Sequence, residues 1–523
     1  MSKAGGDMII PNYVEKNAKL YPDKTAIKVI GDRSCTFSEF KERVYRLANG
    51  LLRLGINKGD RVAVLAENCF EYPEIYFGTA KAGGIVTPLN FRFAPPEVSF
   101  LTNESGAKVL ILQDRYVDTV RSLQPELKTV QQYICIGDAP DGMLNYDAWL
   151  ATLPSTHPGV EIGMEDLFCL IHTGGTTGTP KLTMLTHRNL VNCALVWIIE
   201  TGITYEDVFI VISPLFHTGA AWPLFFSFML GNTFLILKRF DMTEMLETIE
   251  REKVTATMWM SQLVPSVIHH PGMVEKRYDL TSLRLVLVGA AVLPEPHLRK
   301  LLELLPGIRV TNNGGQTECG IFTGIRLEEH LDRSPKKLTS AGKPSILMEI
   351  KIVDENDNEL LPGTAGELCV RGEGVMKGYW NKPEETAWSL RGGWQHTGDI
   401  CRIDEEGYLY YIDRKKDMIK SGGENVYSKE VEDVLYTHPA VAGAAVIGVP
   451  DEKWGEVVKA LVILKEGEKA TPEELIAHCR KYIAGFKCPK SIELRDSFPK
   501  TSLGKINKQK LREPYWQGLG RKL

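Results

Sequence analysis

The chain has 523 residues, a formal net charge of −4 and a pI near 6.3, with 43% hydrophobic and 24% charged residues. That composition is typical of a globular protein with a substantial core, and the length predicts about three structural units. The small net charge excludes a strong positive field that would draw nucleic acid or anionic membranes. The ten cysteines form no C-x-x-C pair, which argues against a disulfide framework and favours a reducing cytoplasm.

Two segments bear on a membrane location. Residues 1–7 contain no apolar run of the kind found in secretory signals, so we expect no targeting segment there. Residues 208–237 carry no charged side chain and are numerous enough to span a bilayer, but Pro214 and Pro223 interrupt them. We therefore expect a buried strand, loop and helix at this place, in a cytoplasmic protein without a transmembrane segment.

The first part of the chain alternates between helical and strand-like segments. Residues 8–60 are predicted to be mainly helical, and Thr36 followed by Glu39 has the spacing of a helix capping box. Short apolar runs of strand type follow, at residues 61–66, 84–89, 108–112, 133–136, 208–212, 233–237 and 283–288. Such alternation predicts an α/β fold of two similar units, each with a largely parallel sheet.

The later part of the chain has a different texture. Short strands and turns predict a small β-rich subdomain over about 340–413. A dense charged run follows and contains the predicted hinge, near Lys416. Helices and strands beyond it predict a small α+β domain, so we divide the chain into an N-terminal lobe, residues 1–413, and a mobile C-terminal cap, residues 414–523.

The most informative stretch is residues 173–181, which read Thr-Gly-Gly-Thr-Thr-Gly-Thr-Pro-Lys after an apolar run. Gly lets backbone N–H groups converge, Thr adds hydroxyl donors and Lys adds a positive charge, so this composition is typical of a polyphosphate-binding loop. The alternative is a plain Gly-rich turn. The Walker pattern fails because Thr179 and Pro180 separate Gly178 from Lys181, which argues against a P-loop kinase or ATPase.

Other short motifs carry candidate chemistry, although each alone is compatible with an ordinary turn or surface charge. Glu318, after Gly-Gly-Gln-Thr, is a natural Mg²⁺ ligand near a phosphate loop. Asp399, in Thr-Gly-Asp, is suited to accept both hydroxyls of a ribose. The remaining candidates are Arg414 in the charged run, the loop at 421–425, and Lys505.

Taken in order, these motifs resemble those of the adenylate-forming superfamily of acyl-CoA synthetases, luciferases and peptide-synthetase adenylation domains. The resemblance spans nearly the whole chain and includes Ala-Gly-Gly at 82–84 and Pro-Leu-Asn at 88–90. It implies an enzyme that uses ATP and Mg²⁺ to activate a carboxylic acid as acyl-AMP, releases pyrophosphate, and transfers the acyl group to the thiol of CoA.

The resemblance also implies roles for individual residues. The implied ATP-binding residues are Thr173, Thr176, Thr177, Gly178, Lys181, Gly289, Ala290, Ala291, Asn312, Gln316, Asp399 and Arg414. The implied catalytic residues are Thr317, Glu318, which would also bind Mg²⁺, and Lys505 on the mobile cap. The implied CoA-binding residues, beyond the hinge at Lys416, are Gly422, Gly423, Glu424, Asn425 and Lys490.

Three residues depart from the family pattern. Gly174 stands where many relatives have Ser, and Leu182 where they have Gly. Gly314 stands where an aromatic side chain often stacks on adenine. Aromatic stacking is worth about 0.5 to 1.5 kcal/mol, so we expect weaker nucleotide binding or a substitute from a neighbouring residue.

The acyl pocket is expected around His217, Trp222 and Trp259. His217 falls where amino-acid-activating relatives place an Asp for the substrate ammonium, so the expected substrate is an apolar acid, fatty or aryl. A CoA ligase is the favoured function. The alternatives are an acyl-AMP ligase that loads a separate acyl carrier protein and a non-catalytic nucleotide-binding protein, and a homodimer is also left open.

Overall fold

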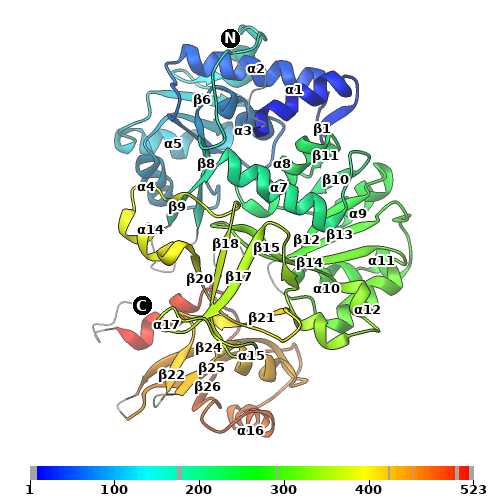
Figure 1. Ribbon diagram of the computed structural model, residues 1–523, viewed down its shortest axis with the longest axis vertical. Helices are drawn as coiled ribbons and strands as arrows, with labels where there is room; N and C mark the ends of the chain where they lie inside the picture. Colours follow the sequence, from blue (N-terminus) through cyan, green and yellow to red (C-terminus); the bar gives the residue numbers. More distant parts are fainter. Residues whose placement is uncertain are drawn as a thin grey trace.

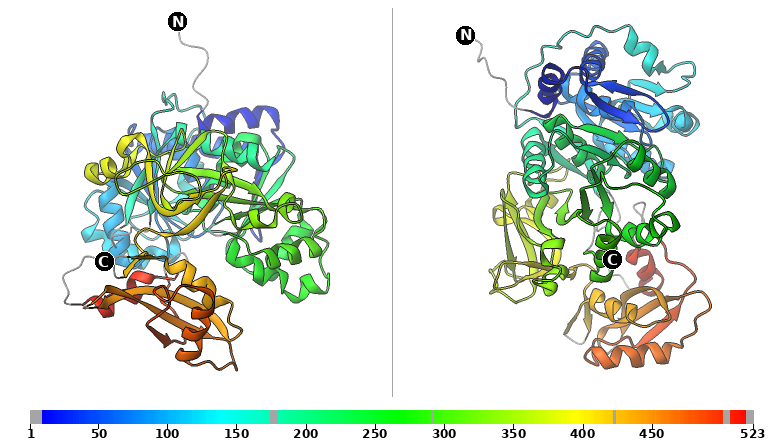
Figure 2. Two further views of the ribbon diagram at one scale, coloured as in Figure 1. Left: turned by 60° about the horizontal axis from the view of Figure 1, so that its bottom comes forward. Right: turned by 90° about the vertical axis from the view of Figure 1, so that its right-hand side faces the viewer.

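The computed structural model describes residues 9–173, 180–289, 292–421, 424–451, 453–500 and 506–517. These residues form a large N-terminal lobe, and a smaller C-terminal domain lies at one end of it (Figures 1 and 2). The lobe contains two large sheets of mixed type and a small antiparallel sheet, and the C-terminal domain has a sheet of its own. This architecture confirms the predicted α/β class with a large N-terminal lobe and a small C-terminal domain.

The first large sheet carries the candidate phosphate loop. Its strand order is β19-β9-β8-β4-β3-β5-β6-β7. The strands are β3 Arg61–Leu65, β4 Ile85–Pro88, β5 Ala107–Gln113, β6 Gln132–Ile136, β7 Leu144–Asn145, β8 Leu167–Thr173, β9 Lys181–Thr186 and β19 Gly378–Tyr379. The pairings from β8 through β7 are parallel, whereas β9 and β19 add antiparallel pairings at the edge. The parallel centre agrees with the prediction from the apolar runs.

The second large sheet has the order β16-β15-β14-β13-β12-β10-β11-β1-β2. Its strands are β1 Thr25–Val29, β2 Ser34–Thr36, β10 Val208–Val211, β11 Thr233–Ile236, β12 Ala256–Met260, β13 Leu285–Gly289, β14 Arg309–Gln316, β15 Gly320–Arg326 and β16 Lys343–Pro344. The prediction that residues 8–60 are mainly helical is wrong at β1 and β2. Strand β1 forms because it pairs in parallel with β11, a partner far along the chain that no local pattern reveals.

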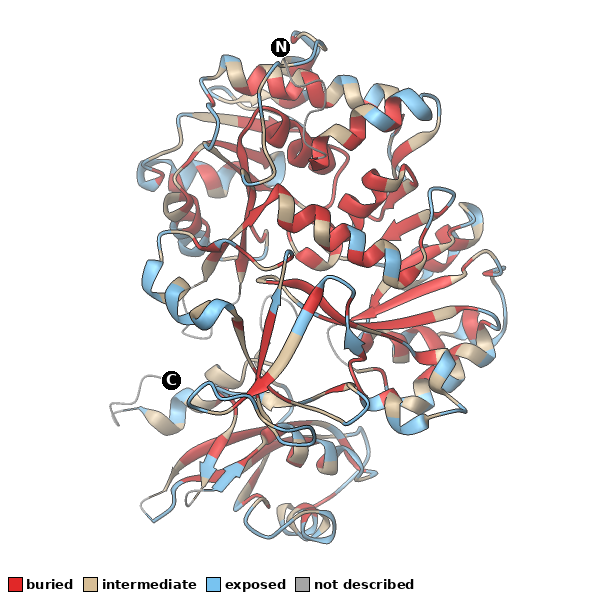
Figure 3. Ribbon diagram, in the orientation of Figure 1, coloured by how far each residue is buried: buried red, intermediate tan, exposed pale blue. Residues whose placement is uncertain are grey.

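The helices of the lobe pack on these sheets, and one continuous core contacts both of them. They are α1 Ile10–Leu20, α2 Phe37–Arg53, α3 Glu71–Lys81, α4 Pro95–Ser105, α5 Val117–Leu123, α6 Tyr146–Ala151, α7 His187–Thr201, α8 Thr218–Leu230, α9 Met242–Arg251, α10 Val264–Ile268, α11 Pro271–Val274, α12 Glu295–Leu304 and α13 Leu327–His330. The capping box of Thr36 and Glu39 at the start of α2 is confirmed. Figure 3 shows burial concentrated in the strands and inner helices.

The uncharged stretch 208–237 forms β10, the buried helix α8 and β11, as predicted. Helix α8 is apolar around its whole circumference because it lies inside the core rather than on the surface. None of the helices in the described ranges combines the length and the apolar character that crossing a bilayer requires.

The small sheet of the lobe has the order β17-β18-β20-β21 and is antiparallel, in agreement with the β-rich subdomain predicted there. Its strands are β17 Met348–Val353, β18 Gly366–Gly372, β20 Gln395–Ile403 and β21 Leu409–Arg414, with helix α14 Pro383–Ser389 between them. The C-terminal domain contains β22 Ile419–Ser421, β23 Glu424–Val426, α15 Ser428–Tyr436, β24 Val441–Asp451, β25 Gly455–Leu464, α16 Pro472–Tyr482, β26 Ser491–Leu494 and α17 Lys508–Trp516. A short turn at 415–417 joins β21 to β22.

Candidate active site

The candidate phosphate loop leaves the sheet between two paired residues. Thr173 ends β8 and Lys181 begins β9, and the two are partners in the antiparallel register. The loop positions Gly174, Thr176, Thr177 and Gly178 lie outside the described residues. The ends of the loop are therefore held together at the edge of the sheet, with a hydroxyl on one strand and an ammonium on the other.

Tyr379 connects this loop to Glu318. The Lys181 ammonium lies 4.8 Å from the centre of the Tyr379 ring. The Tyr379 hydroxyl donates a hydrogen bond to Glu318 Oε1 at 3.2 Å. Tyr379 is placed here by strand β19, which pairs with β9, and nothing in the sequence pattern singled it out. Tyr379 thus contacts the candidate phosphate-binding Lys181 through its ring and the candidate metal ligand Glu318 through its hydroxyl.

Glu318 lies in the turn between β14 and β15, although the preceding Gly-Gly pair would by itself predict a glycine turn. Gly314 and Gly315 belong to strand β14 and pair with β15 across a register shift. Burial raises the pKa of the Glu318 carboxyl, and the hydrogen bond from Tyr379 and the charge of Arg414 offset only part of this effect.

A half-buried carboxylate whose charge is only partly compensated by its neighbours fits a Mg²⁺ ligand. Proteins hold Mg²⁺ at nucleotide sites through one or two carboxylates together with the substrate phosphates. Within the described residues, no cluster of three or more His, Cys, Asp or Glu side chains is arranged to hold a metal by itself. Glu318 would therefore share the ion with phosphate oxygens.

Asp399 is the centre of the candidate ribose site. It lies on β20, is only 3% exposed, and is the register partner of Arg414 on β21. The Arg414 Nε lies 2.7 Å from Asp399 Oδ1, and the Gln316 amide donates to Oδ2 at 2.6 Å. These two contacts fix the orientation of the carboxylate between β14 and β21.

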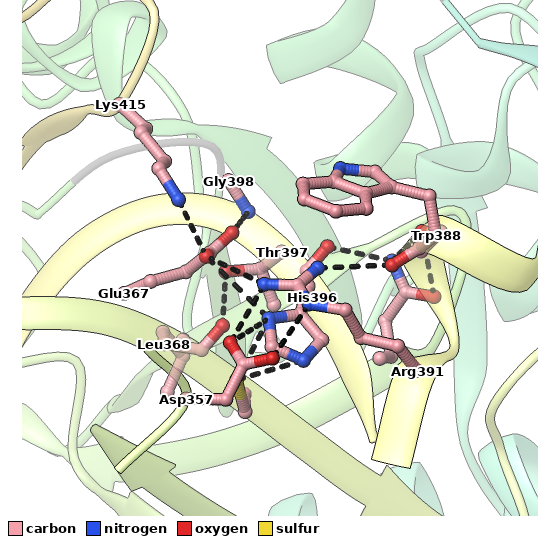
Figure 4. Close-up of polar contacts among 12 residues, drawn as sticks. Asp357, Glu367, Leu368, Trp388, Arg391, His396, Thr397, Gly398 and Lys415 are labelled. Atoms are coloured by element: carbon pink, nitrogen blue, oxygen red, sulfur yellow. Dashed lines mark hydrogen bonds and ion pairs between the residues drawn. The ribbon is translucent and has the colours of Figure 1, made fainter. Parts of the chain in front are cut away.

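A second layer of polar contacts fixes the loop that presents Asp399 (Figure 4). Glu367 Oε1 accepts a hydrogen bond from the Gly398 N–H at 3.2 Å, and its Oε2 lies 2.9 Å from the Lys415 ammonium. The Thr397 hydroxyl accepts from the Asp399 N–H at 3.1 Å. Because Lys415 belongs to the turn that leads into the C-terminal domain, Glu367 links the ribose site to the domain junction.

The electrostatics of Glu367 follow from these partners. Burial by itself would raise the pKa of this carboxyl, but the hydrogen bond and charge of Lys415, with a smaller contribution from His396, lower it below the ordinary value. Glu367 is therefore ionised in the folded protein and holds two chain segments at once. Sequence reasoning did not find it, because its importance comes only from what surrounds it.

The candidate adenine positions lie on neighbouring parallel strands. Gly289 ends β13, and Asn312, which is buried, is the register partner of Val288 on β14. Ala290 and Ala291 lie outside the described residues. Thr317 occupies the turn between Gln316 and Glu318. The expected adenine, α-phosphate and metal positions therefore lie at the carboxyl-terminal ends of two neighbouring strands of the second sheet.

The expected acyl-pocket residues are not all brought together. His217 caps helix α8, where its Nδ1 accepts from the Gly219 N–H at 3.1 Å, so the neutral ring carries its proton on Nε2. Trp222 packs in the core shared by the two large sheets, whereas the fully buried Trp259 belongs to the other core of the second sheet. Trp259 thus packs on the opposite face of the sheet from Trp222.

Met258, the neighbour of Trp259 on β12, packs instead against the core that contains Trp222. Its Cε atom lies 4.0 Å from the position of a Cβ atom added to Gly219 and 3.1 Å from one added to Gly289. Met258 therefore fills the space between the start of α8 and the end of β13.

The C-terminal candidates lie on the domain surface or outside the described residues. Glu424 and Asn425 are exposed on β23, and Lys490 is exposed just before β26. Gly422, Gly423 and Lys505 are outside the described residues. The Lys416 side chain is exposed in the junction turn, and its carbonyl accepts from Arg512 at 3.2 Å.

Comparison with known proteins identifies this combination of fold and site. Residues 14–380 match the family model for the AMP-binding enzyme, and residues 430–505 match that for the AMP-binding enzyme C-terminal domain. The chain therefore belongs to the AMP-binding enzyme family.

Three similar proteins illustrate the family. Feruloyl-CoA synthase from Amycolatopsis sp is 38% identical, over 96% of this chain and 98% of its own. Long-chain-fatty-acid–CoA ligase FadD13 from Mycobacterium tuberculosis is 34% identical, over 92% and 94%. The structure of o-succinylbenzoate CoA synthetase (MenE) from Bacillus subtilis, in complex with the acyl-adenylate intermediate OSB-AMP, is 30% identical with a TM-score of 0.83, over 96% and 98%.

Proposed function

We propose that this protein is an ATP-dependent acid–CoA ligase that activates an apolar carboxylic acid as acyl-AMP and transfers the acyl group to CoA. The observation that carries the proposal is the proximity of two units at the turn between β14 and β15, where Gln316 binds Asp399 and the charge of Arg414 acts on Glu318. One is Lys181, Tyr379 and Glu318, and the other is the Asp399–Arg414 pair. The similarity to named CoA synthases and ligases over nearly the whole chain supports the same conclusion.

In the first half-reaction, the substrate carboxylate attacks the α-phosphorus of ATP in line and expels pyrophosphate. Catalysis of this step consists mainly of holding the reactants and spreading charge from the phosphoryl oxygens. We assign Thr173 and Lys181 to the β- and γ-phosphates, Thr317 to the α-phosphate, and Asp399 to the ribose. Mg²⁺ held by Glu318 would neutralise phosphate charge.

The acid that we propose is fatty or aryl. His217 and Met258 border the space between α8 and Gly289, and an amino-acid substrate would require a carboxylate there for its ammonium group. Trp222 stays in the proposed pocket, whereas Trp259 contributes to it only by packing behind β12. A reducing cytoplasm suits the ten cysteines, which are all buried and free.

In the second half-reaction, CoA would enter along the loop at 422–425 and Lys490 of the C-terminal cap. We place the domain boundary at 413/414, with a hinge at Lys416, because the junction turn separates the small sheet of the lobe from the sheet of the cap. Rotation at this hinge would move Lys505 out of the active site and bring the CoA-binding loop into it. Such gating is a common device of enzymes that catalyse two successive steps.

The test is a panel of aliphatic and aryl acids incubated with ATP and Mg²⁺, with and without CoA. We expect AMP, pyrophosphate and a CoA thioester with at least one apolar acid. AMP formation followed by transfer only to a carrier-protein thiol would instead favour the carrier-loading alternative. Absence of AMP with every acid would support a non-catalytic nucleotide-binding protein.

A further inference from the structure

A cavity separate from the candidate active site lies where the end of helix α7 meets strands β14 and β15. Its volume is about 180 Å³, comparable with the roughly 150 Å³ cavity that takes up benzene in another protein. None of the candidate site residues that the structure describes lines it. Its lining includes Glu200, Thr311, Asn313, Gly324, Arg326 and Lys343.

Strand pairing puts most of these residues on one face of the second sheet. Asn313 of β14 is the register partner of Gly324 on β15, and Gly324 is the partner of Lys343 on β16. Side chains alternate along a strand, so Thr311 shares this face with Asn313, whereas Asn312 between them faces the other way. The cavity therefore lies on the opposite face of β14 from the candidate adenine residue.

Gly324 forms the floor of the cavity because it has no side chain. A Cβ atom added to Gly324 would lie 2.9 Å from Asn313 Nδ2 and 3.3 Å from Glu200 Oε2. Glu200 belongs to the last turn of α7 and reaches the floor from above the sheet. An amide nitrogen and a carboxylate oxygen thus lie side by side over the glycine.

Both polar groups are incompletely compensated by the protein. The Asn313 side chain is only 9% exposed, and its Nδ2 has no hydrogen-bond partner within the described residues. Its Oδ1 accepts from the Thr311 hydroxyl at 3.0 Å, and this contact assigns the orientation of the amide. Burial raises the pKa of the Glu200 carboxyl, and the Ile346 N–H and the charge of Arg326 offset only part of this effect.

The exposed charged groups around the cavity already have partners. Arg326 lies 3.0 Å from Glu329, and the Lys343 ammonium lies 4.7 Å from the centre of the Tyr408 ring. Together with Glu200 these side chains contribute two negative and two positive charges. The cavity therefore has no net charge that would select a cation or an anion.

We propose that this cavity binds a small neutral carboxamide, whose N–H group donates to Glu200 and whose carbonyl oxygen accepts from Asn313. A carboxamide carries a donor and an acceptor side by side and so complements both atoms of the floor. A carboxylate would place negative charge against Glu200, and an ammonium would meet the N–H group of Asn313, so each matches only one atom. The site is additional to the proposed ligase reaction and does not depend on it.

The alternative occupant is water. A polar cavity of this size has room for several water molecules, which donate and accept hydrogen bonds equally well. A cavity that holds only water gives no reason for a carboxamide to bind in preference to a ketone of the same shape. That preference is therefore the decisive measurement.

The probe is nicotinamide, a flat ring with one carboxamide, and its control is the methyl ketone of the same ring. Titrations followed by ligand NMR give both Kd values, with and without saturating AMP. We expect a nicotinamide Kd of about 1 mM or lower, and binding of the ketone at least about fivefold weaker because it has no N–H donor. AMP should leave the nicotinamide Kd unchanged.

Two substitutions each remove one polar atom of the floor at similar side-chain size. Glu200→Leu and Asn313→Leu should each raise the nicotinamide Kd about 5- to 10-fold. Glu200→Leu should also abolish the preference over the ketone, because the partner of the N–H group is lost. Glu303→Leu is the matched control, since Glu303 lies on the surface of α12, 2.9 Å from Lys300, and should not change either Kd.

Absence of saturable nicotinamide binding would overturn the inference and leave a water-filled cavity. Equal Kd values for the two probes, or displacement of nicotinamide by AMP, would also overturn it. If Asn313→Leu does not fold, Glu200→Leu decides the question, because a purely structural role of this side chain would not change the preference between the probes. None of these outcomes alters AMP formation from acid and ATP, so the proposed function is tested separately.

Discussion

At the scale of single residues, Tyr379 and Glu318 determine how the phosphate end of the site is assembled. The ring of Tyr379 receives the Lys181 ammonium and its hydroxyl binds the Glu318 carboxylate, so the two opposite charges are joined without a direct ion pair. Both charged groups are thereby left available to the proposed phosphates and metal. A direct Lys–Glu pair would have neutralised both groups before ATP arrived.

Substitution Glu318→Gln tests this arrangement. The amide keeps an acceptor for Tyr379 but removes the charge proposed to bind Mg²⁺, so AMP formation should fall about 100-fold or more. Burial raises the pKa of Glu318 in the folded state, so the folded protein binds more protons than the unfolded chain between the two pKa values. The folded protein therefore loses stability as pH rises from the unfolded-state pKa to the folded-state pKa. The neutral variant, without ATP and Mg²⁺, should therefore melt at a higher temperature at neutral pH.

Glu329→Gln is the control, because Glu329 is exposed and pairs with Arg326 at 3.0 Å away from the site. It should retain activity and stability. Full AMP formation by Glu318→Gln would refute the role of this carboxylate. A lower melting temperature would show that the negative charge of Glu318 does not destabilise the folded protein.

At the scale of elements, strand β20 is held by contacts that run from the candidate ribose site to the domain junction. Strand β20 presents Asp399, and Glu367 of β18 binds both the Gly398 N–H and Lys415 (Figure 4). Arg391, at the end of α14, adds a two-point ion pair to Asp357, with both distances 2.8 Å. The position of Asp399 thus depends on neighbouring strands and on the turn that leads to the cap.

Substitution Glu367→Gln should destabilise the protein and loosen the ribose loop. The lowered pKa of Glu367 means that its stabilising contribution is present above the unfolded-state pKa and is lost as pH falls through the folded-state value. We expect a loss of about 1 to 3 kcal/mol at pH 7 that shrinks below about pH 4, measured by urea unfolding. The ATP KM should rise because Asp399 is less well held.

The control is Glu349→Gln on the adjacent strand β17. Glu349 is 2.6 Å from Arg371, but both side chains are largely exposed, so its loss should cost under about 1 kcal/mol. Equal effects of the two substitutions, or a loss in Glu367→Gln that does not depend on pH, would contradict the role given to Glu367.

At the scale of the whole molecule, we propose that the junction turn lets one chain serve two reactions. The N–H groups of Asp417 and Met418 both donate to the Arg414 carbonyl, and Arg512 of α17 binds Asp417 at 2.7 Å. Because hydrogen bonds and ion pairs hold this turn, its backbone angles can change while the packing inside either core is kept. The proposed rotation of the cap therefore requires local rearrangement only.

Lys505→Ala should separate the two half-reactions. We expect AMP formation from acid and ATP to fall about 100-fold or more, since a charge at the α-phosphate is lost. Thioester formation from supplied acyl-AMP and CoA should stay within about twofold of the unmodified rate, because the rotated cap no longer uses this lysine. Lys500→Ala, an exposed lysine of the same segment, should affect neither reaction. Equal loss in both half-reactions would refute the two-position cap.

Local patterns in the sequence determined much of this protein. Apolar runs predicted the central parallel strands, the spacing of Thr36 and Glu39 predicted the start of α2, and prolines in an uncharged stretch excluded a membrane helix in favour of buried α8. These features follow from a residue and its near neighbours, through burial, capping hydrogen bonds and backbone geometry. The ordered motifs likewise predicted the family.

Only the tertiary structure decided which residues meet. It turned residues 25–29 into a strand beside β11, made Gly314 part of β14, and sent Trp259 to the far face of β12. It also placed two unanticipated side chains, Tyr379 and Glu367, against the candidate site residues. The physical reason is that these positions are set by strand pairing and packing between distant segments, whose free energy no local pattern contains.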